Sequence, residues 1–236
     1  MIIDADSLDP TAAYKLLIGS IVPRAIAWVS TLSVDGVANL APISFFTAVG
    51  RTPPKVSLSL QPRMDGVTLK DTFVNIRDTG EFVTNLVTLP QVHSVHRTAA
   101  EWDSAQDEFV EVGLEKESCE VVKAPRVKGA PIAMECVLDR IIPGDHNENV
   151  VWGRIVRFHI RDDVYVGDHR VDTAALLPVG RLAAEYTVAE SAFVPPLDEE
   201  VLERYRGVRM RRLDEEDDGW SPIETPAWSP SGSIIE

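Results

Sequence analysis

Apolar and polar positions alternate over short runs in the first part of the chain, as they do in half-buried β-strands. The segment 25–32 is a mixture of apolar, small and β-branched residues, and Asp35-Gly36 separates it from 37–40. Asp-Gly is the strongest short-range turn dipeptide, so these segments predict a β-hairpin. In 56–60 apolar residues alternate strictly with serine, which predicts a strand with one buried and one polar face.

The middle of the chain has helical spacing. A short helix is predicted from Asp71 to Gly80, because glycine readily takes the left-handed conformation that ends a helix. The segment 82–87 then predicts a strand, and the runs 90–100 and 107–112 predict two further short helices.

Four later runs are β-rich and are separated by Pro, Gly and Asp-Asp signals. They are 119–122, 133–142, 150–160 and 164–166. With the earlier strands they give at least seven strands and few helices. We therefore expect a mainly β fold with a helical insert, built as a closed barrel rather than a doubly wound sheet. No Gly-x-Gly-x-x-Gly follows a strand, so a Rossmann dinucleotide site is not supported.

Composition predicts three regions, namely a lead-in over 1–22, a barrel domain over 23–196 and a tail over 197–236. The lead-in contains Asp9-Pro10, which suits the start of a brief helix. The tail combines an acidic block with a stretch rich in Ser, Pro and Trp, and it has no periodicity. Because such a tail cannot form its own core, we expect it to be mobile or to lie across another surface.

Length, composition and net charge exclude several classes of protein. The chain has 236 residues, of which 44% are hydrophobic and 25% charged, as in ordinary globular proteins. Its net charge of −14 opposes nucleic acid and anionic membrane surfaces, so neither is expected as a partner. The start is acidic, unlike a secretory signal, and no apolar run approaches the roughly 20 residues of a membrane span. These features favour a cytoplasmic protein.

Several common catalytic centres lack support in the sequence. His93 and His96 share a helical face but have no third ligand at zinc spacing, so we interpret them as a surface pair and predict no metal site. There is no Gly-x-Ser-x-Gly elbow and no cysteine in a nucleophile signature. Cys119 and Cys136 do not make a disulfide framework, and we interpret both as buried free thiols.

Two segments together suggest a ligand site. Residues 39–47 set an amide, Ser and Thr among apolar neighbours, as a flat and partly polar ligand requires. Lys70 adds a charge at the start of a predicted helix, whose free N–H groups attract anions. A phosphate-bearing aromatic cofactor would satisfy both segments. Each also has an ordinary interpretation, because Asp71 and Thr72 are common helix caps and the apolar residues of 39–47 suit a core.

Several motifs follow one another at regular spacings. They are 14–31, 39–46, Pro53-Pro54, Lys70-Asp71-Thr72 and 80–85, followed by Asp107-Glu108-Phe109 before Gly113-Leu114 and Ala130-Pro131 before Met134-Glu135-Cys136. Their order and spacing strongly resemble the flavin reductase-like, FMN-binding split-barrel family. The resemblance runs from about Tyr14 to Tyr186 and departs from the family at 181–186, where such proteins often carry a glycine pair.

This resemblance implies a homodimeric split β-barrel that binds FMN, or sometimes FAD, near the subunit interface. It implies contacts to the isoalloxazine ring, the ribityl chain and the phosphate. The ring contacts are Asn39, Pro42, Ile43, Ser44, Phe45 and Phe46, the ribityl contacts are Ser59 and Leu60, and the phosphate contacts are Lys70, Asp71 and Thr72. Asp71 would use its backbone N–H, and Arg24 is expected to add positive charge.

The reaction that the resemblance implies is hydride transfer from NADH or NADPH to flavin N5. The protein then positions and polarises the flavin and needs no general acid or base. Our first interpretation is an NAD(P)H-dependent flavin reductase, such as the small component of a two-component monooxygenase. A flavoredoxin-like electron carrier and a flavin-binding module without redox activity stay open, because a fold alone does not choose among functions.

Overall fold

The computed structural model describes residues 1–189 of the chain. They fall into two compact units, one of 1–159 with 179–187 and one of 160–178 with 188–189. The domain limits expected from the sequence stay predictions. The tail expected over 197–236 lies outside the described residues.

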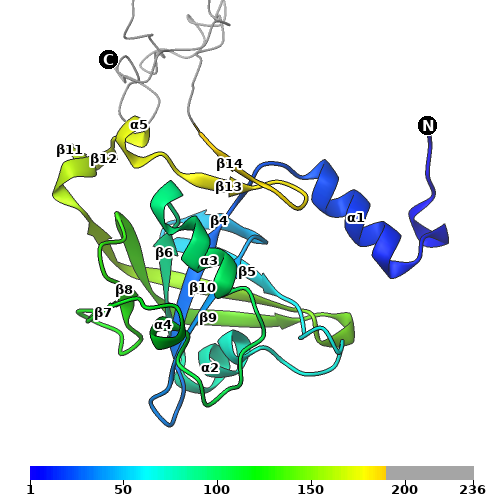
Figure 1. The fold of residues 1–236 in the computed structure, drawn as a ribbon, viewed down its shortest axis with the longest axis horizontal. Coiled ribbons are helices and arrows are strands. Elements are labelled where there is room, and N and C mark those ends of the chain that lie inside the picture. Colours follow the sequence, from blue (N-terminus) through cyan, green and yellow to red (C-terminus); the bar gives the residue numbers. More distant parts are fainter. Residues whose placement is uncertain (190–236) are drawn as a thin grey trace, which may run out of the picture. The chain divides into compact units, whose positions relative to one another are not determined.

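The first unit is built on a seven-stranded sheet (Figure 1). In hydrogen-bonded order its strands are β3 (Ala38–Ile43), β2 (Ala27–Leu32), β6 (Glu81–Leu86), β9 (Ile132–Pro143), β10 (Asn149–Ile160), β5 (Pro54–Leu60) and β4 (Phe46–Arg51). The pairs β3–β2, β2–β6, β6–β9, β10–β5 and β5–β4 are antiparallel. The mainly β class predicted from the sequence is confirmed.

The sequence predicted a closed barrel, and the structure corrects this. The sheet has two edge strands, β3 and β4, which do not pair with each other by hydrogen bonds. These two edge strands are consecutive in the chain, and only Ser44 and Phe45 separate them. So short a link spans at most about 11 Å, so the two sheet edges must approach each other at this point. A covalent connection therefore joins the edges where a closed barrel would have a hydrogen-bonded ladder.

Smaller elements complete the described chain. The short strands β1 (Arg24–Ala25), β13 (Val179–Arg181) and β14 (Tyr186–Val188) form one sheet, and β7 (Lys116–Glu117) pairs with β8 (Arg126–Val127). The helices of the first unit are α1 (Pro10–Ser20), α2 (Asp71–Thr79), α3 (Val92–Arg97) and α4 (Glu108–Glu111), with the 3-10 turns η1 (Ala5–Ser7), η2 (Leu89–Gln91) and η3 (Asp145–Asn147). The second unit contains η4 (Asp162–Val164), β11 (Tyr165–Gly167), β12 (Arg170–Val171) and α5 (Thr173–Leu176).

The strongest local patterns are confirmed. The predicted hairpin forms between β2 and β3, and Gly36 takes a φ of 84° in its turn, which glycine adopts without strain. In β5 the predicted alternation holds, since Val56, Leu58 and Leu60 are buried. The helix α2 ends where predicted, with Gly80 as its left-handed cap.

One predicted strand is wrong. Residues 119–122 form an irregular loop between β7 and β8, and not a strand. The N–H groups of Glu120, Val121 and Val122 donate to the carboxylate of Glu135 on β9, so they are not available for a strand ladder. The strand β4 was not predicted, because most of its residues are exposed and give no alternating pattern.

The main core lies between the sheet and α2, which packs against β2, β3, β6 and β9. Phe73 and Ile76 of the helix join apolar side chains from the strands. Packing is close here, since a Cβ on Gly153 would lie 2.2 Å from Cζ of the fully buried Phe82. Among residues 1–189 no helix has both the length and the apolar character needed to cross a membrane.

Candidate functional site

A pocket of about 160 Å³ opens beside the start of α2. It is formed by β3, the start of α2, the loop after α3 and one residue of α4. Its lining residues are Asn39, Ala41, Pro42, Ile43, Arg63, Lys70, Asp71, Thr72, Thr98, Ala99, Ala100, Glu101, Trp102 and Glu108. Six of the twelve residues predicted to bind the cofactor are among them, namely Asn39, Pro42, Ile43, Lys70, Asp71 and Thr72.

The start of α2 offers free donors to this pocket. Lys70 is the N-cap residue, and its carbonyl accepts the N–H groups of Phe73 (2.9 Å) and Val74 (3.1 Å). The N–H groups of Asp71 and Thr72 come before the first helical hydrogen bond, and residues 1–189 supply no acceptor for them. Unpaired donors at a helix start attract an anion.

The Lys70 side chain adds a positive charge at the same place. Burial lowers the pKa of Lys70, and the nearby Glu101 carboxylate opposes that shift. Lys70 forms no ion pair with any residue in the described range 1–189. A partly desolvated cation that forms no ion pair within residues 1–189, next to free N–H groups, fits an anionic ligand group such as a phosphate.

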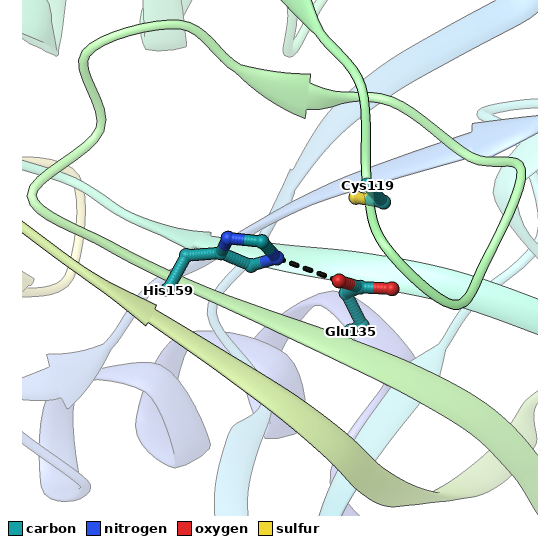
Figure 2. Close-up of side chains that lie close together, drawn as sticks. All are labelled: Cys119, Glu135 and His159. Carbon is teal, nitrogen blue, oxygen red and sulfur yellow. Dashed lines mark hydrogen bonds and ion pairs between the residues drawn. The ribbon is translucent and has the colours of Figure 1, made fainter.

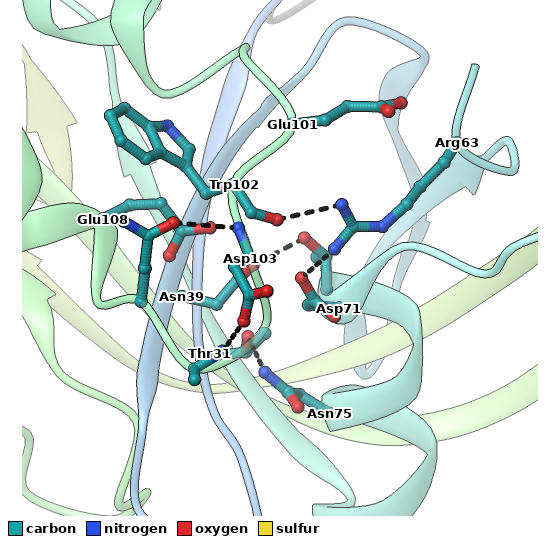
Figure 3. A network of polar contacts seen from close by, with 12 residues as sticks. Thr31, Asn39, Arg63, Asp71, Asn75, Glu101, Trp102, Asp103 and Glu108 are labelled. Atoms are coloured by element: carbon teal, nitrogen blue, oxygen red, sulfur yellow. Dashed lines mark hydrogen bonds and ion pairs between the residues drawn. The ribbon is translucent and has the colours of Figure 1, made fainter. Parts of the chain in front are cut away.

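The carboxylate of Asp71 does not contribute to binding an anion, because it is paired with Arg63. Arg63 Nη2 lies 2.6 Å from Asp71 Oδ2, and Arg63 Nη1 donates to the carbonyl of Trp102 at 2.9 Å (Figure 3). The free N–H of Asp71 is therefore the group that it can offer to a ligand, and its phosphate contact stays a prediction. Sequence reasoning missed Arg63, since nothing local marks a loop arginine as the partner of a helix eight residues later.

A buried polar network fixes Asn39 on the pocket wall. Its amide is fully satisfied when its nitrogen donates to Glu108 Oε1 (3.1 Å) and its oxygen accepts from the hydroxyls of Thr72 (3.0 Å) and Thr31 (3.2 Å). Asn75 Nδ2 in turn donates to Thr31 Oγ1 at 3.0 Å (Figure 3). Because β2, β3, α2 and α4 all contribute, the network holds the predicted ring contact and the predicted phosphate contact in one arrangement.

Glu108 is the second residue that sequence reasoning did not assign to the site. Its side chain is 6% exposed, and its Oε2 accepts the Leu40 N–H at 3.2 Å. Burial raises the pKa of Glu108 to about 7, and the charges of Asp71 and Asp107 add to this effect. The pocket wall thus contains a carboxyl group that changes charge near neutral pH. Its motif, 107–109, was visible in the sequence only as a family landmark.

The other predicted contacts do not line this pocket. Ser44, Phe45 and Phe46 lie where β3 passes into β4, and Ser59 donates its N–H to the Phe45 carbonyl at 2.9 Å. Leu60 is 2% exposed and belongs to the main core. The structure brings these residues together near the junction of the sheet edges, and their cofactor roles stay predictions.

Arg24 also lies elsewhere. Its guanidinium donates to the carbonyls of Ile18 (2.6 Å), Ile21 (2.9 Å) and Leu182 (2.6 Å), and it lies 5.9 Å from the centre of the Phe45 ring. Burial lowers the pKa of Arg24. These bonds join the end of α1 to β1 and to the segment after β13. The predicted contribution of Arg24 to a phosphate site stays a prediction.

Comparison with known proteins decides the family. Residues 18–174 match the model of the flavin reductase like domain. The chain belongs to this family. An uncharacterised relative from Aquifex aeolicus (strain VF5) is 38% identical over 180 residues, which cover 76% of this chain and 91% of the relative. Family membership implies flavin binding and flavin-dependent redox chemistry.

Two solved structures are similar in both fold and sequence. Nitrilotriacetate monooxygenase component B from Bacillus cereus is 35% identical with a TM-score of 0.76, and the match covers 80% of this chain and 95% of that one. The 2-nitrobenzoate 2-nitroreductase NbaA of Pseudomonas fluorescens is 28% identical with a TM-score of 0.75, and the match covers 84% of this chain and 97% of that one. The split-barrel fold predicted from the sequence is confirmed.

Proposed function

We propose that this protein is an NAD(P)H-dependent flavin reductase that binds FMN in the pocket beside α2. The observation that carries the proposal is the unpaired Lys70 ammonium next to the free N–H groups of Asp71 and Thr72. These groups would hold the phosphate of the flavin. Phosphate binding at a helix N-terminus uses both the local donors and the helix dipole.

The remaining wall of the pocket would hold the ring system. Asn39 presents a rigid amide, and Pro42 and Ile43 present apolar surface beside it. The flavin, once bound, supplies the chemistry by accepting a hydride at N5 from NADH or NADPH. The protein residues bind and orient the cofactor, so the pocket requires no catalytic acid or base. Likeness to a monooxygenase component B supports a role as the reductase of a two-component monooxygenase.

We also propose that the protein is a homodimer. The helix α1 buries none of its residues within the described chain, and Tyr14, Leu16 and Leu17 are 51%, 43% and 45% exposed. An apolar helix surface of this kind favours contact with a second copy. A Leu16→Asp, Leu17→Asp variant is expected to sediment as a monomer at concentrations where the parent protein is a dimer. Equal sedimentation of the two proteins would contradict this interface.

The reductase proposal is tested by anaerobic absorbance in the flavin band. Purified protein with FMN is mixed with NADH or with NADPH, and bleaching faster than in a protein-free control is the expected result. Comparison of the two donors gives the preference. Binding of FMN without faster bleaching would instead indicate an electron carrier that a protein partner reduces.

The phosphate contact is tested separately by titration of FMN. A charge-assisted hydrogen bond contributes about 1.5–3 kcal/mol, so Lys70→Ala should weaken FMN binding roughly tenfold to a hundredfold. Lys128→Ala is the matched control, because Lys128 is exposed, pairs with Glu115 and lies outside the pocket. Equal FMN affinity of the Lys70→Ala and parent proteins would overturn the assignment.

A second candidate function is direct reduction of an organic acceptor by the bound flavin. The observation that favours it is the likeness to a 2-nitrobenzoate 2-nitroreductase over 84% of this chain. A nitroaromatic acid added to the anaerobically reduced protein would reoxidise the flavin if this function is correct. Retention of flavin through gel filtration would accompany this function, whereas a reductase that delivers flavin must release it.

A further inference from the structure

A second group of chemically active side chains lies outside the flavin pocket. Cys119 in the loop between β7 and β8, Glu135 on β9 and His159 on β10 converge at one point (Figure 2). One ligating atom from each residue lies within 4.8 Å of the other two. The flavin proposal uses none of the three, and none of them lines the pocket beside α2.

The backbone holds the Glu135 carboxylate in place. Its Oε1 accepts the N–H of Glu120 at 2.9 Å, and its Oε2 accepts those of Val121 (2.7 Å) and Val122 (2.8 Å). The side chain is fully buried. Metal-binding carboxylates are commonly oriented by such outer hydrogen bonds, so this carboxylate is pre-positioned and not free to rotate.

The same three hydrogen bonds fix the position of Cys119. They anchor the loop immediately after this residue, and Glu81 anchors its far end by accepting the N–H groups of Lys123 (2.6 Å) and Ala124 (3.2 Å). Cys119 is half-buried against the apolar cluster that includes Val83 and Val122. The Cys119 thiol is therefore held in a fixed loop beside the Glu135 carboxylate.

His159 closes the group from the neighbouring strand. Its Nε2 lies 2.6 Å from Glu135 Oε1, and its side chain is 18% exposed, so one side of the group is accessible from solvent. Sulfur, nitrogen and oxygen ligands at tetrahedral zinc would be about 3.3–3.7 Å apart, given bond lengths of about 2.0–2.3 Å. The His159–Glu135 separation of 2.6 Å would have to widen to reach these values, and all three ligating atoms already lie within 4.8 Å of one another.

We propose that Cys119, Glu135 and His159 form a mononuclear zinc site with a fourth position open to solvent. The mixed sulfur, nitrogen and oxygen ligand set is of the type that zinc prefers over magnesium and calcium. Zinc would take the place of the proton shared between His159 and Glu135, and it would connect the loop after β7 to the sheet. The site is independent of the flavin pocket.

Cobalt substitution tests this site directly. The full-length protein is stripped with a chelator, dialysed and titrated with Co²⁺, which reports a thiolate ligand through a charge-transfer band in the near ultraviolet. The sequence contains only two cysteines, so the band can come from Cys119 or Cys136 alone. We expect one Co²⁺ per chain with this band, displacement of the band by Zn²⁺, and loss of both band and bound metal in Cys119→Ser and His159→Ala.

Cys136→Ser is the matched control. Cys136 lies on β9 beside Glu135 but is buried in the main core, with its Sγ 3.6 Å from the Met134 carbonyl. This variant should keep the charge-transfer band and the metal content of the parent. Absence of the band in the parent protein, or equal metal binding by the parent and Cys119→Ser, would overturn the proposal and leave the group as a hydrogen-bonded clamp. An FMN titration of the same samples reports on the flavin proposal independently.

Discussion

Glu108 and Glu135 are both buried carboxylic acids, with 6% and 0% of their surfaces exposed, yet their surroundings give them opposite acid strengths. For Glu108 burial dominates and raises the pKa to about 7. Burial also disfavours the charged form of Glu135, but three backbone N–H groups and His159 outweigh it, and the pKa falls to about 2. The balance between burial and the hydrogen bonds donated to a buried carboxylate decides its charge.

The difference in pKa between Glu108 and Glu135 follows from the parts of the structure in which the two residues lie. Around Glu135 the donors are backbone groups of a fixed loop, so this carboxylate is part of the architecture. Around Glu108 the donors are the N–H groups of Leu40 and of Glu108 itself and the amide of Asn39, and they do not outweigh burial, so the pocket wall keeps an incompletely stabilised carboxyl group. Incomplete stabilisation is common where a protein must accommodate a ligand.

Removing the Glu135 carboxylate should have the largest effect. Glu135→Ala leaves the N–H groups of Glu120, Val121 and Val122 without their acceptor, and breaking a buried charged network of this kind costs about 3–5 kcal/mol. Urea unfolding in the presence of a chelator measures this loss without any metal contribution. Glu81→Ala is the control, because Glu81 anchors two N–H groups and is partly exposed, so its loss should be smaller. Equal losses would show that donor number does not set the difference.

Glu108 should make the stability of the protein fall as the pH rises, which is the opposite of the trend that Glu135, with its lowered pKa, contributes. Its folded-state pKa of about 7 lies above the ordinary value of 4.5, so the folded state binds the proton more tightly. The stability that this group contributes is present below pH 4.5 and is lost as the pH rises through 7, by up to about 3 kcal/mol. Unfolding of parent and Glu108→Gln between pH 5 and about 8 measures this, and the variant should show the flatter profile. Parallel profiles would contradict the raised pKa.

A third carboxylate, Asp71, provides an intermediate case, since it is ion-paired and about one-fifth exposed (22%). Asp71→Asn keeps the N–H proposed to bind phosphate but removes a negative charge beside it. We expect FMN affinity to rise a few-fold and stability to fall by about 1–3 kcal/mol, because the partly buried Arg63 guanidinium loses a charged hydrogen-bond partner. Titration of FMN and urea unfolding measure the two effects. Weaker FMN binding by this variant would indicate that the Arg63–Asp71 pair itself shapes the pocket.

Much of the fold could be predicted because its signals are local. The turn at Gly36, the alternation in β5 and the left-handed end of α2 at Gly80 each depend on a few adjacent residues. Such features are set by backbone conformation and by side-chain periodicity, which a sequence displays directly. The sequence also predicted Lys70, Asp71 and Thr72 at a helix start, although the N-cap residue is Lys70, which makes no side-chain capping bond, and not Asp71 or Thr72.

The loop 119–122 shows where local reasoning fails. Its residues have the composition of a strand, but a carboxylate thirteen to fifteen residues further along the chain takes up its N–H groups. Arg63, Glu108 and the Asn39 network were missed for the same reason, because each acts through partners on other elements. β-propensity describes a tendency, and tertiary hydrogen bonds override it.

The sequence by itself determined most of the elements, the family motifs and the helix start proposed to receive a phosphate, but not β4 or the loop 119–122. Only the tertiary structure decided that Glu108 lies in the pocket wall and that Cys119, Glu135 and His159 meet at one point. The physical reason is that strand order sets which distant side chains become neighbours. That order depends on the packing of the whole sheet and leaves no local pattern in the sequence.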